Sequence, residues 1–395
     1  MPATGRTYII AGAGISGMTL ALALAKFGAG IVLLERSPNV QEFGAGLQIS
    51  PNARHCLDQL GLGAALDRVS LEPQALDVYP QGSQRPSMSM ELGDIMRDRF
   101  GAPYAVMHRA DLADLLYKAC RRFANIDIAF GVRHWDVVSH ERGVTVALDE
   151  ADGLSRTIRG EAFIGADGVH SHTRRAVLEG PDARFGNRIA WRTLVPTDLV
   201  SGQIAPDRVS VFFGTGFHLV CYPLPHRRQV NLALFMPDTS AEPQGQPRPL
   251  KPGPKVEAIL AAAGQSWTPW PLNTVQTPVW HRGNIGLIGD AAHAMVPFQA
   301  QGAAMGIEDA AVLAPLLVET KSAETAFAQY AGIRQPRVSR VAALSAQNGR
   351  IFHLPWPLSM GRDAVMAAQG PRAHLRRLGW IYDYKAGATS GAALL

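Results

Sequence analysis

The chain has 395 residues, of which 47% are hydrophobic and 18% are charged, with a formal net charge of +5 at pH 7. This length exceeds what one compact core usually holds, so two interlocked domains are expected. A mild positive balance without a run of Lys and Arg argues against a nucleic-acid partner. Three widely spaced cysteines, Cys56, Cys120 and Cys221, suggest neither a disulfide framework nor a metal site and fit a reducing cytoplasm.

The first predicted elements are a strand, a glycine-rich turn and a helix. A short buried strand is followed at once by GAGISG, and apolar residues at helical spacing then run to Phe27. In such a turn the first glycine permits the bend, the second lets a diphosphate approach the backbone, and the third lets the helix pack closely on the strand. The helix N-terminus adds free N–H groups. The expected diphosphate-binding residues are Gly12, Gly14, Ser16 and Gly17.

A second strand over 31–34 brings Glu35 to its carboxyl end, followed by Arg36. A carboxylate there can accept both hydroxyls of an adenosine ribose, so the region predicts an adenine dinucleotide site, without distinguishing FAD from NAD. The apolar run over 8–25 also resembles a signal sequence or a membrane span. Its glycines, Ser16 and Thr19, and the lack of a basic start and a cleavage site, argue against both.

Residues 43–53, FGAGLQISPNA, are expected to be irregular, and an amphipathic stretch over 53–60 follows. Such a backbone is used where a loop passes a ligand, and it is equally typical of an ordinary loop. Residues 74–100 are predicted to form a strand, a polar turn and a second strand, inserted away from the first domain.

The sequence MHRADL at 107–112 opens a predicted helix that runs to about residue 123. Asp111 lies where a first-turn acid complements the helix dipole. Arg109, just before the helix, can reach a phosphate or a ribityl hydroxyl with its planar guanidinium. An arginine at a helix start is, taken alone, more often a surface residue.

Strand-like segments at 126–130, 136–138 and 144–148 precede GADGVHSHTRR. Here a buried strand ends at Asp167, and Gly168 allows a sharp exit before a helix start. A second carboxylate is therefore expected at the rim of the first sheet.

Residues 181–280 change character and predict an antiparallel sheet, with strands at 189–195, 209–213, 218–222 and 229–235. The proline-rich run over 237–255 is predicted to be a solvated connection. His218 and Tyr222 are four apart and share one face of their strand. Such a pair can orient a polar aromatic ring, with the histidine as proton acceptor. On the pattern alone, an ordinary sheet histidine beside a core tyrosine is the more common explanation.

The stretch over 283–317 predicts a buried strand that ends at Asp290, an irregular piece, and a long helix from about Ala303. The N-terminus of that helix offers unpaired N–H groups and a partial positive charge beyond Asp290. A reduced flavin carries negative charge on the pyrimidine side of its ring, so this is a suitable mount for one. Helical patterns continue to about Ser345, and the small residues at the end of the chain are expected to fray.

The order of these motifs resembles that of the class A flavoprotein monooxygenases, the aromatic hydroxylases built on the para-hydroxybenzoate hydroxylase fold. The resemblance runs from about residue 6 to 350 and rests on GxGxxG with Glu35–Arg36, GAG at 44–46, HRADL, GADGVHSHTRR, and GDAAHxxxPxxxQG ending in EDA. Within this family the chain is most similar to the salicylate hydroxylase-like members. These share a GAG(L/I)-x-(I/L)-x-PNA loop and a His-x-x-x-Tyr-Pro strand, here His218 to Pro223.

The resemblance implies bound FAD, with NADH or NADPH as co-substrate and no separate nicotinamide-binding domain. It implies that Glu35 binds the FAD ribose, Arg109 the phosphate or ribityl part, and Asp290 a ribityl hydroxyl. It places the flavin ring against the backbone of two residues, Gly302 and Ala303, and links two others to both FAD and NAD(P)H, Asp167 and Arg174.

The resemblance also makes His218 and Tyr222 face the substrate ring, with Gln48 and Gln299 as further pocket residues. Position 299 is commonly apolar in close relatives, as in PFLAQG, so its glutamine leaves the identity of the substrate open. The hypothesis is a monooxygenase in which a flavin hydroperoxide, formed from NAD(P)H and dioxygen, hydroxylates a small phenolic or hydroxylated aromatic acid. An apolar pocket would protect the reaction from water.

Other functions fit parts of the pattern. A flavin-dependent epoxidase or reductase would use the same fold, whereas a halogenase would be expected to carry Trp-x-Trp-x-Ile-Pro, which is absent. A flavin- or nicotinamide-binding regulatory protein without turnover remains open. A plain NAD-dependent dehydrogenase has no use for the Gly289-Asp290 and Gln301-Gly302 elements.

The predicted fold class is α/β with an α+β substrate layer: a Rossmann-like FAD-binding domain interleaved with an antiparallel-sheet substrate domain and a C-terminal helical segment. The expected boundaries are 1–73, 101–180 and 281–350 for the FAD-binding domain, 74–100 and 181–280 for the substrate domain, and 351–395 for the helical tail. A cytoplasmic monomer or homodimer is expected.

Overall fold

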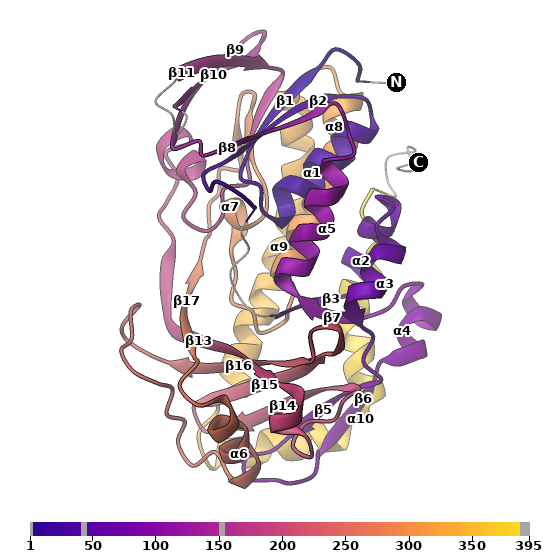
Figure 1. Ribbon diagram of the computed structural model, residues 1–395, viewed down its shortest axis with the longest axis vertical. Helices are drawn as coiled ribbons and strands as arrows, with labels where there is room; N and C mark the ends of the chain where they lie inside the picture. Colours follow the sequence, from indigo (N-terminus) through magenta and orange to yellow (C-terminus); the bar gives the residue numbers. More distant parts are fainter. Residues whose placement is uncertain (1–2, 41–45, 150–154, 388–395) are drawn as a thin grey trace.

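The computed structural model describes residues 3–40, 46–149 and 155–387. Within them the chain forms two larger sheets, one near each end of the molecule, with long helices running between them (Figure 1). The predicted fold class is confirmed: an α/β layer is combined with an antiparallel layer and C-terminal helices.

The six-stranded sheet has the order β18-β19-β12-β1-β2-β8 and is parallel except at β18. Its central strands have continuous apolar runs, as expected of a sheet covered on both faces. The strands are β1 (Thr7–Ala11), β2 (Gly30–Glu35), β8 (Ile126–Phe130), β12 (Ala162–Gly165), β18 (His281–Arg282) and β19 (Ile285–Leu287).

Helices cover this sheet on one side, where α1 packs between α5 and α8 (Figure 1). Helix α1 is buried along nearly its whole length, which explains why its sequence lacks a polar face. The helices of this part are α1 (Ile15–Lys26), α2 (Pro51–Gln59), α3 (Gly63–Val69), α5 (Arg109–Cys120), α7 (Asp290–His293), α8 (Gly302–Glu319) and α9 (Ala323–Phe352).

The seven-stranded sheet has the order β17-β13-β16-β15-β14-β5-β6 and is antiparallel except between β14 and β5. Both strands expected over 74–100 belong to it. Its strands are β5 (Ala75–Tyr79), β6 (Met88–Glu91), β13 (Arg184–Pro196), β14 (Arg208–Gly214), β15 (Phe217–Leu224), β16 (Gln229–Pro237) and β17 (Thr268–Thr274).

Two small sheets, the long helix α10 and several short helices complete the described chain. The sheets contain β9 (His134–His140), β10 (Gly143–Asp149) and β11 (Ser155–Gly160), and β3 (Gly46–Ile49), β4 (Ser70–Leu71) and β7 (Ala105–His108). The remaining helices are α4 (Gly93–Phe100), α6 (Pro254–Ala263), α10 (Leu358–Tyr382), a π-helix (Thr173–Val177) and two 3₁₀ turns (Thr197–Val200 and Pro225–Arg227).

The segment expected to be irregular over 43–53 is partly regular. Residues 46–49 form β3, paired with β7, and α2 begins at Pro51, whose fixed φ suits a first helical turn. The prediction failed because the glycines dominated the local pattern while the pairing partner lies some sixty residues further along the chain. Gly44 and Ala45 of the GAG motif lie outside the described residues, as does the end of the chain from 388.

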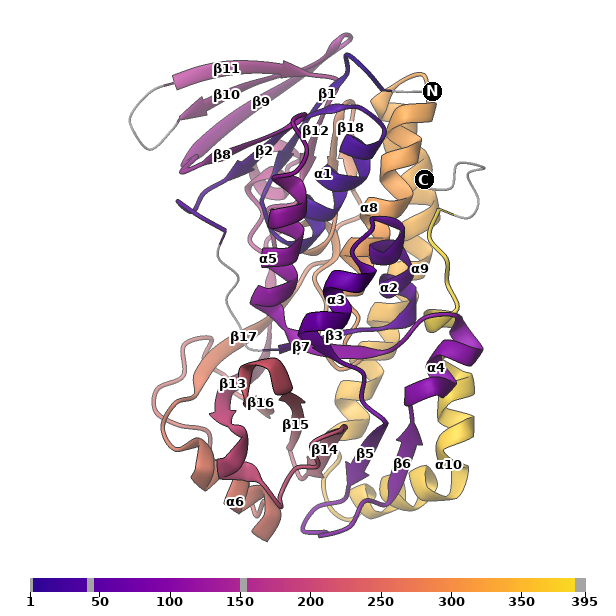
Figure 2. The ribbon, with the colours of Figure 1, turned by 45° about the vertical axis from the view of Figure 1, so that its right-hand side comes forward.

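The C-terminal segment is more than a tail. Helix α10 packs against β6, beside the seven-stranded sheet (Figure 2). Helix α9, expected to end near Ser345, continues to Phe352, and the proline-rich connection gives way to α6 at Pro254. The sequence predicted a helical segment here but not the bounds of α10, because Gly370, with φ 67°, and Pro371 interrupt its helical period.

Candidate active site

A cavity of about 1800 Å³ lies between the two larger sheets. At one end it is lined by the carboxyl ends of β1 and β2 and the segment after β12, and at the other by one face of the seven-stranded sheet. Residues of α9 and α10 close a third side. The cavity is therefore larger than most small-molecule sites and has room for an extended ligand together with a second, smaller one.

The turn after β1 has a backbone that only glycine fits. Gly12 has φ 104°, and a Cβ there would lie 2.4 Å from the carbonyl oxygen of Ala166. A Cβ on Gly17 would lie 2.0 Å from the carbonyl oxygen of Gly12, so the helix and the turn are in direct contact. Gly14, which caps α1, provides no side-chain acceptor for the first N–H groups of the helix. Gly12, Gly14 and Ser16 line the cavity, so the free N–H groups at the start of α1 can bind an anion there.

Glu35 is held at the end of β2 by two backbone donors. Its Oε2 accepts from the N–H of Ala13 at 2.9 Å and its Oε1 from the N–H of Ser37 at 2.8 Å. A carboxylate has about four lone-pair sites, so both oxygens retain acceptor capacity toward the cavity that Glu35 lines. The exposed Arg36 lines the same end.

The segment after β19 meets this turn directly. A Cβ on Gly289 would lie 2.5 Å from Oγ of Ser16, and one on Gly306 would lie 2.0 Å from the same atom. Helix α7 and helix α8 are thereby packed against the start of α1. Asp290 is exposed at the first turn of α7 and lines the cavity, as do Gly302 and Ala303 at the start of α8. Segments nearly 280 residues apart in the chain thus share one cavity.

These residues fit an adenine dinucleotide that ends in a flavin. The glycine turn is a cradle that a Cβ would fill, Glu35 is a pinned carboxylate with acceptors to spare, and α8 presents its N-terminus near Asp290.

Three further predicted residues lie at or behind this wall. Arg109, the first residue of α5, and Asp167 line the cavity. Asp167 accepts from Oγ of Ser171 at 2.5 Å and from the N–H of Thr173 at 2.9 Å, so it organises the following π-helix. Arg174 is fully buried, lies outside the lining, and donates to three backbone carbonyls, those of Val169, Pro181 and Ala291. Its observed contacts position the backbone of the wall; they do not reach into the cavity.

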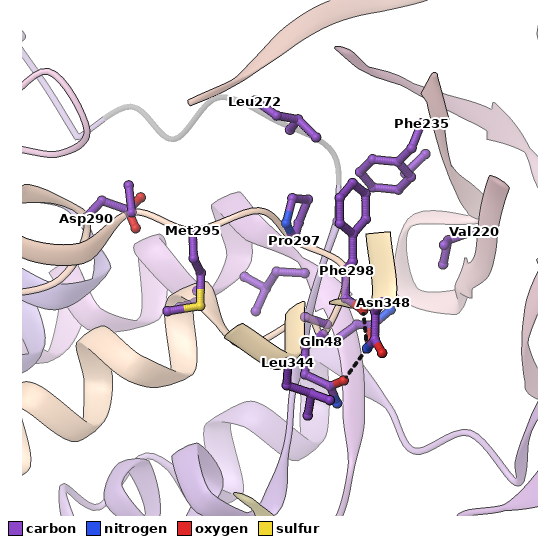
Figure 3. Close-up of a pocket in the computed structure, with 18 of the residues that line it drawn as sticks. Gln48, Val220, Phe235, Leu272, Asp290, Met295, Pro297, Phe298, Leu344 and Asn348 are labelled. Atoms are coloured by element: carbon purple, nitrogen blue, oxygen red, sulfur yellow. Dashed lines mark hydrogen bonds between the residues drawn. The ribbon is translucent and has the colours of Figure 1, made fainter. Parts of the chain in front are cut away.

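The opposite wall of the cavity is one face of the seven-stranded sheet, formed by alternate residues of neighbouring strands. His218, Val220 and Tyr222 alternate on β15, and their partners on β16 are Phe235, Ala233 and Asn231. All six line the cavity. Figure 3 shows Phe298 beside Phe235, with Val220 near this end and with Asp290 and Met295 toward the other. The wall is therefore largely apolar and aromatic, with polar groups at separate points.

His218 lies deep in this wall, only 2% exposed. Its ring stacks on Phe235, with centroids 4.5 Å apart, and its Nδ1 is 2.8 Å from Nε2 of His353. Burial and the neighbouring cations hold the pKa of His218 well below its usual value, so its ring is neutral at pH 7.

Tyr222 is also buried, and burial raises the pKa of its phenol. The phenol packs on the backbone of Gly46, where a Cβ would lie 2.2 Å from its oxygen. Only a glycine at position 46 therefore allows this contact. Gln48 and Gln299 line the same cavity. Gln48 accepts from the hydroxyl of Tyr104, and Gln299 accepts from Nδ2 of Asn348 at 2.7 Å.

Sequence reasoning missed several residues of the cavity. Arg192 of β13 is the cross-strand partner of Ala233, and its Nε has no hydrogen-bond partner among the described residues. His353, which contacts His218, and Arg362, which lines the cavity, lie after the expected end of the long helix. No local signal marks them: Arg192 acquires its neighbours from other strands of the sheet, and His353 and Arg362 acquire theirs only when α9 and α10 pack against it.

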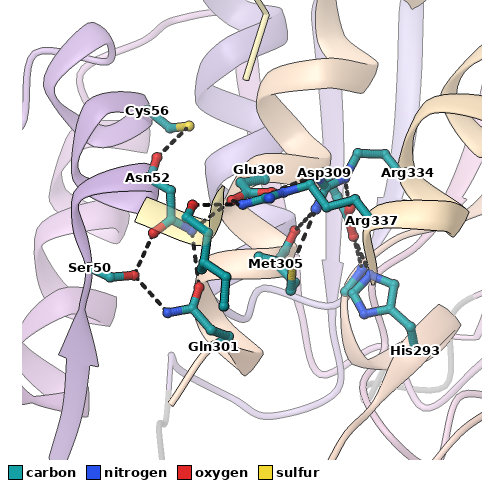
Figure 4. Close-up of polar contacts among 12 residues, drawn as sticks. Ser50, Asn52, Cys56, His293, Gln301, Met305, Glu308, Asp309, Arg334 and Arg337 are labelled. Atoms are coloured by element: carbon teal, nitrogen blue, oxygen red, sulfur yellow. Dashed lines mark hydrogen bonds and ion pairs between the residues drawn. The ribbon is translucent and has the colours of Figure 1, made fainter. Parts of the chain in front are cut away.

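A buried ionic network holds the loop before α8 in place (Figure 4). Arg334 of α9 donates to Glu308 at 2.5 Å and to Asp309 at 2.7 Å, and all three side chains are fully buried. Asp309 also accepts from the N–H of Gly289 at 2.9 Å and pairs with His293 at 2.5 Å. The EDA and GDAAH motifs are thus two sides of one network that fixes the backbone next to Asp290.

The same network makes stability depend on pH. The contacts with His293 and Arg334 lower the pKa of Asp309 despite its burial. A lowered folded-state pKa gives stabilisation that is complete above the unfolded value of about 4 and is lost as the pH falls below it. Urea unfolding at pH 7, 5, 4 and 3 is expected to show this loss, and Asp309→Asn is expected to flatten it. If the free energy of unfolding of the variant fell with pH as steeply as that of wild type, Asp309 would not be the cause of the pH dependence.

Comparison with known proteins identifies the family to which this fold and cavity belong. A family model described as an FAD binding domain matches residues 6–193 and 255–345. The chain is 31% identical over 384 residues to 3-hydroxybenzoate 6-hydroxylase 1 of Aquipseudomonas alcaligenes, covering 95% of this chain and 96% of that one.

Two solved structures share the fold. Klebsiella pneumoniae HpxO, complexed with FAD and uric acid, matches with TM-score 0.82 at 22% identity, over 95% of this chain and 96% of that chain. A salicylate hydroxylase in a substrate complex matches with TM-score 0.76 at 24% identity, over 100% and 99%. Among the helices of the described part, none combines the length and apolar character needed to cross a membrane.

Proposed function

Because this chain belongs to the FAD-binding domain family, as an FAD-dependent monooxygenase of the class A aromatic hydroxylase type, we propose that it hydroxylates a small phenolic carboxylic acid with NAD(P)H and dioxygen. The observation that carries the proposal is the shared cavity. The glycine turn and Asp290 line one part of it, and an aromatic wall with His218 and Tyr222 lines another.

The residues have separate roles in this proposal. Glu35 binds the ribose of FAD, the turn after β1 its diphosphate, Arg109 its phosphate or ribityl part, and Asp290 a ribityl hydroxyl. The backbone at the start of α8 holds the flavin ring. FAD, when bound there, would supply the redox chemistry that couples oxidation of NAD(P)H to the use of dioxygen. Asp167, which lines the cavity, contributes to the binding of FAD and NAD(P)H. Arg174 contributes indirectly, because it holds the backbone of the cavity wall through its hydrogen bonds to carbonyl oxygens.

The substrate ring is proposed to lie against the aromatic wall. His218 contacts its hydroxyl and Tyr222 helps to position it, with Gln48 and Gln299 as nearby polar contacts. Phe235 and Phe298 exclude water from the reacting centre, which a reactive oxygen donor requires. The three buried, unpaired cysteines agree with the proposed cytoplasmic location.

A substrate screen tests the proposal. The purified, yellow protein is mixed with NADH or NADPH and each of the three monohydroxybenzoates and several hydroxypyridine carboxylates, and nicotinamide oxidation is followed with product mass. 3-Hydroxybenzoate, named for the bacterial relative, is the first compound to try. One compound is expected to stimulate oxidation and gain one oxygen atom. Flavin reduction without any oxygenated product would favour a reductase, and bound flavin without substrate-dependent turnover would favour a regulatory protein.

Replacing His218 by Ala is expected to lower the rate of hydroxylation by about 10²- to 10³-fold, the usual effect of removing one positioned hydrogen-bonding group from the reacting oxygen. FAD content is expected to be unchanged, because His218 lies on the sheet wall and not on the glycine turn. Stopped-flow reduction and product yield measure the two effects separately. Coupled turnover at the wild-type rate would remove His218 from the mechanism.

A further inference from the structure

Three side chains from distant parts of the sequence form one line of nitrogen atoms that ends at the aromatic wall. Nη1 of Arg188, on β13, lies 2.6 Å from Nδ1 of His353, at the end of α9. Nε2 of His353 lies 2.8 Å from Nδ1 of His218, on β15. Among the described residues the ring of His218 makes its hydrogen bond through Nδ1, and His218 lines the cavity. The line therefore connects a cation to the substrate wall.

The positions of the hydrogens along this line follow from what each group can do. A guanidinium has donors only, so Arg188 must donate to Nδ1 of His353. Burial and the nearby Arg188 lower the pKa of His353 to about 3, and His218 is also held neutral, so each ring carries a single hydrogen. The hydrogen of His353 is then on Nε2 and is donated to Nδ1 of His218. That leaves the hydrogen of His218 on its Nε2.

One other acceptor competes for Nδ1 of His353. The carbonyl oxygen of Gly349 lies 2.8 Å from it and would accept if Nδ1 carried a hydrogen. In that arrangement an N–H group of Arg188 would point at another N–H group across 2.6 Å. A charge-assisted bond from guanidinium to ring nitrogen is about twice as strong as a neutral bond. The arrangement set by Arg188 therefore prevails.

We propose that Arg188 and His353 fix His218 as a hydrogen-bond donor, so that its Nε2–H binds the hydroxyl oxygen of the substrate ring as a phenolate. This inference rests on the proposed function and adds Arg188 and His353 to its site, as the residues that determine which ring nitrogen of His218 carries the hydrogen. The O–H bond of the substrate breaks on binding, and its electron pair stays on the substrate oxygen. The proton leaves to solvent, because every nitrogen of the two histidine rings already carries a hydrogen or accepts a hydrogen bond. Arg188 and His353 are positioning residues.

The charges around the pair favour an anion at this place. Arg188 faces it from β13 and Arg362 from α10, where the Arg362 guanidinium lies 4.5 Å from the ring centre of Phe213 and pairs with Asp363 at 2.8 Å. These two arginines are the cations that affect both histidines, and no carboxylate acts on either ring within the described residues. A negative ring oxygen near His218 would meet a positive field.

The first experiment reads the hydrogen positions without any substrate. The holoenzyme is labelled with ¹⁵N-histidine, and the His218 signals are identified by their loss in His218→Gln. Wild type is expected to show a protonated Nε2 and an unprotonated Nδ1; the reverse would overturn the proposal. Arg188→Met should free Nδ1 of His353 to donate to Gly349, which reverses the line and moves the His218 hydrogen to Nδ1. Arg184→Met, an exposed arginine of the same strand, should leave it on Nε2.

The second experiment measures the proton itself. The screened substrate is bound at a pH below its free pKa, in weak buffer with a pH indicator, while its ultraviolet spectrum is recorded. A phenolate spectrum with release of about one proton per bound ring is expected, because the anion is stabilised and no protein group stores the proton. A phenolate spectrum without release would mean that a protein group keeps the proton, and a neutral phenol spectrum would mean no ionisation; either overturns the proposal. If no phenol of the screen binds or turns over, the proposed function fails, while the ¹⁵N result still decides the hydrogen positions.

Discussion

Replacing Arg334 by Met is expected to lower the free energy of unfolding by about 3–5 kcal/mol, the usual effect of removing one member of a buried ionic group. Arg334 is fully buried and bonds both Glu308 and Asp309, so the variant leaves two buried carboxylates with fewer donors. Arg337 and His293 retain part of the compensation, because each still pairs with one carboxylate. Urea unfolding of wild type and variant at pH 7 measures the change. The dependence of the unfolding free energy on urea concentration is compared between the two proteins.

Arg350→Met is the matched control, since Arg350 is exposed on the same helix and has the same side chain. It is expected to change stability by less than about 0.5 kcal/mol. The Arg334 variant should also bind flavin more weakly, because Asp309 holds the N–H of Gly289 and His293, on either side of Asp290. Equal stability of the two variants would show that the network contributes little to the fold.

The sequence was informative where the needed chemistry is local. The glycine turn and Glu35 lie within 24 residues of one another, and each has a backbone reason that a pattern can reveal, such as the positive φ of Gly12. The position of His218 and Tyr222 on one face of β15 was likewise predictable, because side chains alternate between the two faces of a strand. For the same reason the main strands of both larger sheets were predicted near their observed positions.

The sequence was silent where a residue acquires its meaning from a distant partner. His353 looks like an ordinary residue after a helix, and its importance appears only when it touches His218, 135 positions earlier. Arg174 belongs to a recognisable motif, yet its side chain points into backbone carbonyls and away from the cavity. A motif thus identifies that a residue is needed, and only packing shows whether it contacts a ligand or supports one that does.

Replacing Asp290 by Ala is expected to weaken FAD binding by about 10- to 100-fold, because hydrogen bonds to a charged group contribute about 1.5–3 kcal/mol. Asp290 is exposed at the first turn of α7, lines the cavity, and makes no hydrogen bond that the described residues show, so its removal spares the protein core. The variant should purify with less yellow colour and regain it with excess FAD. Flavin fluorescence quenching during titration of the apoprotein gives both dissociation constants.

Asp94→Ala separates this effect from the general loss of an acid at a helix start. Asp94 is also an exposed first-turn acid, on α4, but it does not line the cavity. Both variants lose a similar interaction with a helix dipole, worth about 0.3–1 kcal/mol, so their thermal stabilities without flavin should fall alike. A difference in FAD affinity between them then measures what Asp290 does for the ligand. Full flavin occupancy in Asp290→Ala would show that the start of α7 does not contribute to FAD binding. The glycine turn and Glu35 would then be the main contacts of the cofactor.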